Sequence, residues 1–159
     1  MSADFELFIE RTLDAPVSAV WRAWTEHLEE WWAPKPWTSR IVAQDLRAGG
    51  KFVIDMRGDD GTGGPMEGIF LEVTPQRRIV FTNALDGDWN PKTPYPVQIV
   101  GYFELTDLGD GKTGYRAGAR HWTAEPMEQH RAMGFEQGWA ICAGQLEAVA
   151  QRLAETADA

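Results

Sequence analysis

The segment near the C-terminus of this 159-residue chain constrains the fold more than any other. Its apolar residues recur every three or four positions, at Phe135, Trp139, Cys142, Leu146, Val149 and Leu153. That spacing places side chains on one face of an α-helix. The pattern predicts one long helix from about Glu125 to Ala154, roughly 45 Å from end to end. Such a helix needs a broad apolar surface to pack against.

Alternating apolar and polar residues before this helix predict a series of β-strands. The predicted strands span residues 5–15, 38–45, 52–57, 66–73, 78–84, 97–108 and 113–122. Turn residues separate most of them, and Gly109-Asp110-Gly111 is a strong hairpin signal. Consecutive strands joined by hairpins form an antiparallel sheet with one apolar face to cover. We therefore expect an α+β fold in the order β-α-α-β-β-β-β-β-β-α, with a curved antiparallel sheet wrapped around the last helix.

The length of the chain fits a single domain, placed at residues 5–155 with flexible termini at 1–4 and 156–159. Acidic residues outnumber basic ones by 24 to 15, and the net charge of −9 repels phosphate backbones and anionic membranes. The single cysteine, Cys142, cannot form an internal disulfide. The N-terminal residues lack a signal-peptide pattern, and no apolar run approaches the ~20 residues of a membrane span. We expect a cytoplasmic protein that binds neither nucleic acid nor a membrane.

Tryptophan is concentrated just after the first predicted strand. Five of the eight tryptophans fall within seventeen residues, namely Trp21, Trp24, Trp31, Trp32 and Trp37. They belong to two short predicted helices that stop at Pro34 and Pro36. So much aromatic area either fills a core or lines a cavity. Trp31 and Trp32 are adjacent and cannot both face inward on a helix, so we expect one to close a cavity and the other to meet solvent or a partner.

Sequence motifs spread over residues 5–155 keep the order and spacing of a known family. In the first half they are Ala15-Pro16, Val20 to Thr25, Trp31-Trp32, Gly49 to Phe52, Gly68 to Pro75 and Arg78 to Thr82. In the second half they are Arg120-His121-Trp122, His130, Met133-Gly134-Phe135 and Gly138-Trp139. The chain thus resembles the activator of heat-shock protein 90 ATPase family, and its C-terminal motifs look like those of a bacterial single-domain branch. That family lies within the START-like (SRPBCC, birch-pollen-allergen-like) superfamily.

The resemblance implies a helix-grip fold around a hydrophobic cavity. In the superfamily such cavities hold lipids, sterols, polyketides and other apolar ligands. Some relatives are cyclases or hydrolases, and the family name comes from co-chaperones. A fold used for so many purposes does not define one activity.

The last predicted strand carries the polar residues of greatest interest. His121 shares its strand parity with Tyr115, Ala117 and Ala119, so these four side chains face the same way. The two alanines leave room on that face for a ligand. There His121 and Tyr115 could hydrogen-bond a ligand, or catalyse a reaction with His121 as acid/base and Tyr115 polarising a carbonyl. The alternative is that His121 anchors the strand-to-helix corner through backbone hydrogen bonds.

The start of the last predicted helix holds further candidates. His130 lies off the apolar stripe and is either solvated or at the mouth of a cavity. Gly134 and Gly138 each cost a helix ~1 kcal/mol, so they indicate close packing or room for a ligand. Met133 suits an adaptable apolar site. His121 and His130 give a metal two ligands, which do not make a closed site, so we expect no metal and no cofactor.

These observations lead to a binding hypothesis. We expect a small hydrophobic or aromatic molecule to bind, without catalysis, between the sheet and the last helix. The expected ligand-binding residues are Trp32, Met56, Phe70, Phe81, Phe103, Tyr115, Ala117, His121, His130, Met133 and Gly134. One alternative is a polyketide-cyclase- or hydrolase-like enzyme that uses His121 and Tyr115. A second is a co-chaperone-like protein whose exposed aromatic residues contact a large partner, and a homodimer is also compatible with the sequence.

Overall fold

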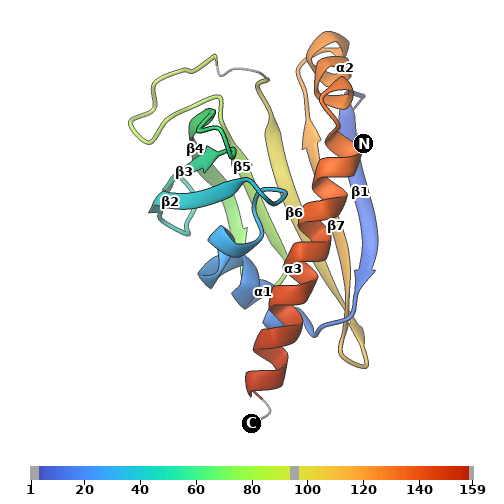
Figure 1. Ribbon diagram of the computed structural model, residues 1–159. Coiled ribbons are helices and arrows are strands. Elements are labelled where there is room, and N and C mark those ends of the chain that lie inside the picture. The colour runs from blue at the N-terminus through green and yellow to red at the C-terminus, as the bar shows by residue number, and fades with distance from the viewer. Residues whose placement is uncertain (1–3, 94–96, 158–159) are drawn as a thin grey trace.

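A computed structural model describes residues 4–93 and 97–157 of the chain. The elements are β1 (Glu6–Leu13), α1 (Val17–Glu26), η1 (Leu28–Glu30), β2 (Thr38–Gln44), β3 (Lys51–Arg57), β4 (Gly63–Thr74), β5 (Arg78–Thr82), β6 (Val100–Gly109), β7 (Lys112–Arg120), α2 (Ala124–Ala132) and α3 (Phe135–Ala157). Figure 1 shows α3 lying in front of a curved sheet, with α1 beside its C-terminal half. The α+β fold with a long C-terminal helix over an antiparallel sheet is confirmed.

The seven strands form one antiparallel sheet in the order β1-β7-β6-β5-β4-β3-β2. Strands β2 to β7 each pair with their chain neighbour, while β1 joins on the far side of β7. Residues that pair directly across strands share a face of the sheet. The register therefore aligns Ile9, Ala117, Phe103 and Ile79 in one row across β1, β7, β6 and β5. Register shifts in the β2–β3, β4–β5 and β6–β7 pairs mark irregularities that bend and twist the sheet.

The concave face of the sheet carries the core. Trp24 of α1 is fully buried against aromatic rings of the sheet. Its ring centroid lies 6.0 Å from that of Phe52, 6.2 Å from Phe70 and 5.2 Å from Phe103. Leu146 of α3 is fully buried in the same cluster. Aromatic residues of α1 and apolar residues of α3 thus cover one face of the sheet together.

The C-terminal segment is two helices and not the single helix that the sequence predicted. α2 ends at Ala132, and α3 begins at Phe135. Gly134 between them has a φ of +91°, a left-handed conformation that ends helices and that glycine adopts without strain. Its N–H donates to the carbonyl of Arg131 over 3.0 Å. α3 then continues to Ala157, past the predicted end of the domain, whereas residues 1–3 and 158–159 of the predicted flexible termini lie outside the described residues.

Side chains at the end of β5 replace part of the predicted β-ladder. The sequence predicted strands at 78–84 and 97–108, but β5 ends at Thr82 and β6 begins at Val100. The Asn83 amide donates to the carbonyl of Val97 and accepts the N–H of Ile99, over 2.9 and 2.8 Å. The Thr82 hydroxyl donates to the carbonyl of Ile99 over 2.8 Å. The backbone of 97–99 is therefore hydrogen-bonded by side chains instead of by a neighbouring strand.

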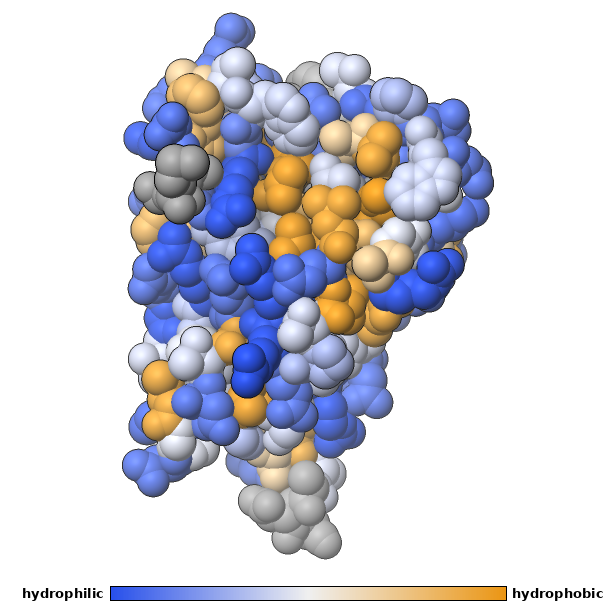
Figure 2. Space-filling model, turned by 180° about the vertical axis from the view of Figure 1, so that it is seen from behind, coloured by the Kyte–Doolittle hydropathy of each residue, from blue (hydrophilic) through white to orange (hydrophobic). Residues whose placement is uncertain are grey.

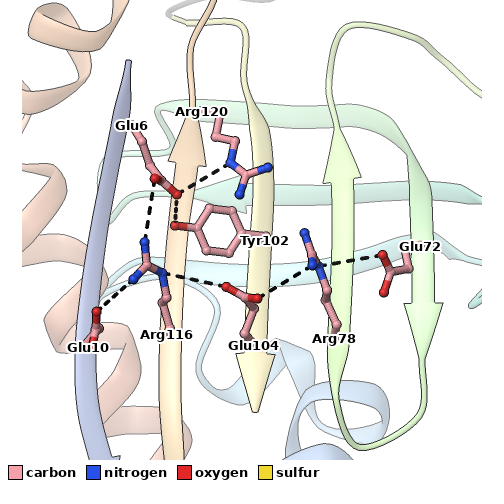
Figure 3. A network of polar contacts seen from close by, with 8 residues as sticks. All are labelled: Glu6, Glu10, Glu72, Arg78, Tyr102, Glu104, Arg116 and Arg120. Carbon is pink, nitrogen blue, oxygen red and sulfur yellow. Dashed lines mark hydrogen bonds and ion pairs between the residues drawn. The ribbon is translucent and has the colours of Figure 1, made fainter. Parts of the chain in front are cut away.

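The outward face of the sheet is polar over β1, β7 and β6, and Figure 2 shows apolar residues gathered on its other half. Eight residues from five strands form the polar network in Figure 3: Glu6, Glu10, Glu72, Arg78, Tyr102, Glu104, Arg116 and Arg120. Arg116 lies 2.9 Å from Glu10 and 3.7 Å from both Glu6 and Glu104. The Tyr102 hydroxyl donates to the Glu6 carboxylate. The charges on this face are thus paired with one another.

Candidate functional site

A cavity lies between the concave face of the sheet, the start of α3 and the segment 31–37. Its volume is about 390 Å³, within the range of small-molecule pockets. None of the side chains that line it carries a charge, and four are tryptophans. The lining residues are Trp31, Trp32, Ala33, Pro34, Trp37, Met56, Met66, Phe81, Ile99, Phe103, Tyr115, Gly138, Trp139 and Cys142.

Aromatic rings form the wall of the cavity on the side of the sheet. Phe81, Phe103 and Tyr115 project onto the concave face from the neighbouring strands β5, β6 and β7. The rings of Phe81 and Phe103 are stacked, with centroids 6.2 Å apart. Trp139 of α3 stacks on Phe103 at 5.8 Å, with the two planes inclined by 8°. Direct ring contact therefore joins α3 to the sheet beside the cavity.

Both adjacent tryptophans face inward, so the expectation that one of them would turn to solvent or a partner was wrong. Trp31 is buried, and its indole N–H donates to the carbonyl of Ala23 over 3.0 Å. Trp32 is half-buried, with its ring centroid 5.7 Å from that of Trp31. The reason is the backbone: Trp31 follows the short helix η1 with a φ of −139°, so the ~100° turn between successive residues of an α-helix does not apply.

Trp37 lies at the rim of the cavity, where 41% of its surface is exposed. Its ring packs against the hairpin between β3 and β4. A Cβ added at Gly58 or Gly63 would come within 3.0 or 3.1 Å of that ring. The two glycines therefore make room for Trp37 beside the entrance, where its ring can shield a bound molecule from water.

Two titratable side chains belong to the wall, and both are uncharged near neutral pH. Burial raises the pKa of the Cys142 thiol to about 12, and the thiol donates to the carbonyl of Trp32 over 3.2 Å. Burial likewise raises the pKa of Tyr115, a residue that is 4% exposed. The wall of the cavity thus presents no charge to a ligand.

His121 and His130 form a hydrogen-bonded pair at the corner between β7 and α2. The backbone N–H of His121 donates to the carbonyl of Phe5 over 2.8 Å, and its Nδ1 lies 2.9 Å from the same oxygen. Nδ1 must carry a proton there, because a carbonyl can only accept. The Nε2 of His121 then accepts from the Nδ1 of His130 over 2.9 Å, and the His130 ring packs on Phe135. The pair anchors the corner, which is the alternative that the sequence left open for His121.

Burial keeps this pair neutral. Burial, together with the smaller effect of the neighbouring His121, lowers the pKa of His130 to about 4. Burial also lowers the pKa of His121, although the hydrogen bond to Phe5 acts in the opposite direction. The aromatic rings of Phe135 and Trp139 face His130 from α3. A proton added to either ring would have to break one of these hydrogen bonds or be buried without a counter-charge.

The catalytic pair considered from the sequence is not assembled. Tyr115 lies in β7, whereas His121 follows the last residue of that strand, and the six positions from one to the other span ~20 Å of extended chain. His121 is bonded to Phe5 and His130, whereas Tyr115 lines the cavity. The structure therefore does not bring these two side chains together.

Five of the expected ligand-binding residues line the cavity: Trp32, Met56, Phe81, Phe103 and Tyr115. The other six lie elsewhere: Phe70, Ala117, His121, His130, Met133 and Gly134. Phe70 is stacked on Phe52 in the core, with centroids 4.7 Å apart, and Ala117 is fully buried beneath the packed elements. Met133 is 55% exposed because it stands with Gly134 at the break between α2 and α3.

Several lining residues were missing from that set. Trp139 and Cys142 belong to the apolar stripe of α3, and helical spacing does not distinguish core residues from those of a cavity wall. Gly138 carried a usable signal as a glycine within a helix. A Cβ added there would meet nothing within 4 Å, so the space beside it is open.

No group of three or more His, Cys, Asp or Glu side chains suited to hold a metal occurs among residues 4–93 and 97–157. Within the same residues, no helix combines the length and the apolar character needed to cross a lipid bilayer.

Comparisons with known proteins agree with this architecture. A sequence model of the family described as "Activator of Hsp90 ATPase homolog 1-like protein" matches residues 14–151. The crystal structure of a protein from Nitrosomonas europaea is 36% identical, covers 96% of this chain and 97% of its own, and has a TM-score of 0.85. For a protein from Mycobacterium smegmatis the identity is 27%, the coverage 91% and 90%, and the TM-score 0.75.

The solution structure of an AHSA1-like protein from Aeromonas hydrophila is 21% identical, covers 93% of each chain and has a TM-score of 0.65, which supports the fold alone. No curated protein matches the sequence.

Proposed function

The chain belongs to the activator of Hsp90 ATPase homolog 1-like family, and from this premise we propose that it binds one small, uncharged, mainly apolar molecule in the cavity between the sheet and α3. The observation that carries the proposal is the cavity itself, about 390 Å³ lined by uncharged and largely aromatic side chains. START-like folds commonly bind hydrophobic ligands, which agrees with this assignment.

The size of the cavity favours a ligand over a packing defect. Voids in protein cores rarely exceed the size of a water molecule. A closed apolar cavity of roughly 150 Å³ holds benzene. A space of about 390 Å³ therefore suits a molecule of two or three fused rings or an equivalent branched chain.

The chemistry of the wall favours a neutral ring system. Phe81, Phe103, Trp32 and Trp139 present ring faces and edges against which a flat molecule can stack. A carboxylate or ammonium group would lose its hydration without gaining a counter-ion from any lining residue. The occupant should therefore be uncharged.

A hydrocarbon probe tests the proposal. Isopropenylnaphthalene should bind with a dissociation constant on the order of 10 µM, the value expected for an apolar molecule of this size. Quenching of tryptophan fluorescence would report binding, and titration calorimetry would give the stoichiometry of one.

A blocking variant and a matched control connect binding to the cavity. Gly138→Leu places a side chain in the open space beside the cavity and should weaken binding at least ~10-fold, while leucine favours the helix by ~0.8–1 kcal/mol over glycine. Gly144→Leu makes the same change on α3, where an added Cβ meets the Arg11 guanidinium at 3.8 Å and the residue does not line the cavity. It should leave the affinity unchanged. No binding to the wild type, or equal losses in the two variants, would overturn the proposal.

The enzymatic alternative, contact with a chaperone and formation of a homodimer stay predictions. Trp89 and Trp122, with 62% and 51% of their surface exposed, are the residues at which a protein partner would first be sought.

A further inference from the structure

Tyr115 stands apart from the rest of the cavity wall as a buried polar side chain. It lies in the middle of β7, opposite Arg11 of β1 and Leu105 of β6, and points onto the concave face. Its side chain is 4% exposed and lines the cavity. Its ring centroid is 6.4 Å from that of Phe103.

The hydroxyl of Tyr115 has no hydrogen-bond partner in the described part of the chain. The side-chain nitrogens and oxygens there that are both unpartnered and sealed from solvent belong to Trp24, Ser39, Gln44, Arg78 and Arg120. The Tyr115 oxygen is not sealed in this way, so it keeps accessible surface. For a residue this deeply buried in the cavity wall, that surface faces the cavity.

The second deeply buried tyrosine shows what a partnered hydroxyl looks like in the same sheet. Tyr102 of β6 is 1% exposed, and its hydroxyl donates to Glu6 on the outward face. Buried tyrosine hydroxyls usually find such a partner. A hydroxyl without one loses its hydration and gains nothing in return, unless a bound molecule supplies the missing hydrogen bond.

The other buried polar groups of the wall are already bonded within the protein. The Cys142 thiol donates to the carbonyl of Trp32, and the Trp31 indole donates to the carbonyl of Ala23. The remaining lining tryptophans, at 32, 37 and 139, are partly exposed residues. Tyr115 is thus the deepest group in the wall that has a hydrogen bond to give.

The surroundings of Tyr115 also define the charge that its partner should have. Arg11 is the nearest cation across the strand pair, but its guanidinium is 3.1 Å from Glu147 and donates to the carbonyl of Ala140. Burial raises the pKa of Tyr115, so its hydroxyl stays protonated and can donate. The hydroxyl suits a neutral acceptor oxygen, since no free cation is present in the wall to balance an anion.

We propose that Tyr115 is the specificity-determining residue of the cavity, and that it selects neutral ring compounds with a carbonyl or similar acceptor oxygen over hydrocarbons of the same shape. This inference rests on the proposed function, because it concerns the ligand of the same cavity. It adds the chemical class of the ligand and names the one side chain that recognises it.

Three probes with one ring system test the proposal: naphthyl methyl ketone, isopropenylnaphthalene, which replaces the carbonyl oxygen by a methylene group, and naphthoate, which is an anion. Calorimetry gives the affinity of each for the wild type, Tyr115→Phe and the outward-face control Tyr102→Phe. In Tyr115→Phe the ratio of ketone to hydrocarbon affinity should fall about two- to twelvefold, the range for one net hydrogen bond. Tyr102→Phe should leave that ratio unchanged, and naphthoate should bind more weakly than the ketone to all three proteins.

Infrared spectroscopy gives a readout that a purely structural role would not change. The carbonyl band of the bound ketone should lie at lower frequency in the wild type than in Tyr115→Phe, because a hydrogen bond weakens the C=O bond. An unchanged affinity ratio, an unchanged carbonyl band, or tighter binding of naphthoate than of the ketone would overturn the inference. If the hydrocarbon still binds and Gly138→Leu still blocks it, the proposed function stands without this inference. If no probe binds the wild type, the proposed function itself fails.

Discussion

The two faces of the sheet differ in how a buried polar side chain is hydrogen-bonded. On the outward face, Glu6 has 7% of its side chain exposed and is surrounded by partners: it accepts a hydrogen bond from Tyr102 and lies 3.6 Å from Arg120 and 3.7 Å from Arg116. On the concave face, Tyr115 is buried to a similar degree, yet its hydroxyl meets an uncharged cavity. On the outward face the charged side chains are paired with one another, whereas the hydroxyl of Tyr115 on the concave face has no hydrogen-bond partner in the described part of the chain. This difference between the faces indicates where a ligand is needed.

The largest loss of stability should come from a substitution in the aromatic core on the concave face. Trp24→Ala removes a fully buried ring that contacts five other aromatic rings, and should lower the free energy of unfolding by ~3–5 kcal/mol. Trp122→Ala, at a tryptophan with 51% exposure, should change it by less than ~0.5 kcal/mol. Urea unfolding measures both values. Similar decreases in the free energy of unfolding for the two variants would mean that Trp24 does not lie in the core.

A substitution in the polar network of the outward face should lower the free energy of unfolding by a smaller amount. Tyr102→Phe removes the hydrogen bond to the Glu6 carboxylate, and bonds to charged groups contribute ~1.5–3 kcal/mol. The loss should appear in urea unfolding at neutral pH. Burial, together with this bond, raises the pKa of Tyr102 to about 12, so an absorbance titration of the folded wild type should show a tyrosine that ionises well above the ordinary value of about 10. A loss below ~0.5 kcal/mol would contradict the account of this face.

The corner where β7 meets α2 should add a smaller, pH-dependent effect. Burial lowers the pKa of His130 to about 4, while an unfolded histidine titrates near 6.5. Between these values the unfolded chain binds more protons, so the free energy of unfolding should fall as the pH falls from about 6.5 toward 4. Because His130 is only partly buried, we expect the contribution to be ~1–2 kcal/mol and not the full value that the shift would give.

His130→Gln keeps a hydrogen-bonding side chain that does not titrate. We expect the free energy of unfolding, measured in urea between about pH 4.5 and 7.5 on either side of the ordinary histidine pKa, to depend less on pH in this variant than in the wild type, by ~1–2 kcal/mol. Equal slopes in the wild type and His130→Gln would contradict a buried neutral pair.

The smallest effect should come from the unmatched group of the concave face. Without a ligand, Tyr115→Phe removes a hydroxyl that has no protein partner, so the free energy of unfolding should change by no more than ~0.5 kcal/mol in either direction. Placed beside Tyr102→Phe, this variant compares one buried tyrosine on each face of the same sheet. If Tyr115→Phe lowered the free energy of unfolding as much as Tyr102→Phe does, the Tyr115 hydroxyl would have a hydrogen-bond partner within the protein.

The fold could be predicted because its signals are local. Strand alternation and the stripe from Phe135 to Leu153 each report which face of an element is buried, and both were correct. The break in the C-terminal helix was missed, although the apolar stripe starts only at Phe135 and a glycine precedes it. Gly134 was interpreted as room for a ligand, whereas it supplies the positive φ that ends α2.

The cavity was harder to predict because it depends on the distance between elements. Trp139 and Leu146 share one stripe of α3, yet Trp139 lines the cavity and Leu146 is fully buried. Helical spacing gives the direction of a side chain but not the gap in front of it. The same limit explains Tyr115 and His121: strand parity correctly placed them on one face, but their separation along β7 gave them different roles.

The outward network also escaped the sequence analysis, although a signal existed. Glu6 and Glu10 are four positions apart on β1 and therefore point to the same face, as do Arg116 and Arg120 on β7. The two strands thus carry opposite charges on one face of the sheet. The pairing of β1 with β7 joins segments more than 100 residues apart, as the hydrogen bond between Arg116 and Glu10 shows. Sequence patterns alone do not supply that register.

Nuclear magnetic resonance of the tryptophan indole N–H groups tests the central claim most directly. The eight tryptophans sample the whole molecule, with Trp31, Trp32, Trp37 and Trp139 at the cavity and Trp89 and Trp122 exposed on the surface. On titration with naphthyl methyl ketone, the indole signals of the four cavity residues should shift and saturate together, while those of Trp89 and Trp122 stay in place. Shifts confined to the two surface tryptophans, or no shift in any of the eight signals, would contradict a ligand held on the concave face of the sheet.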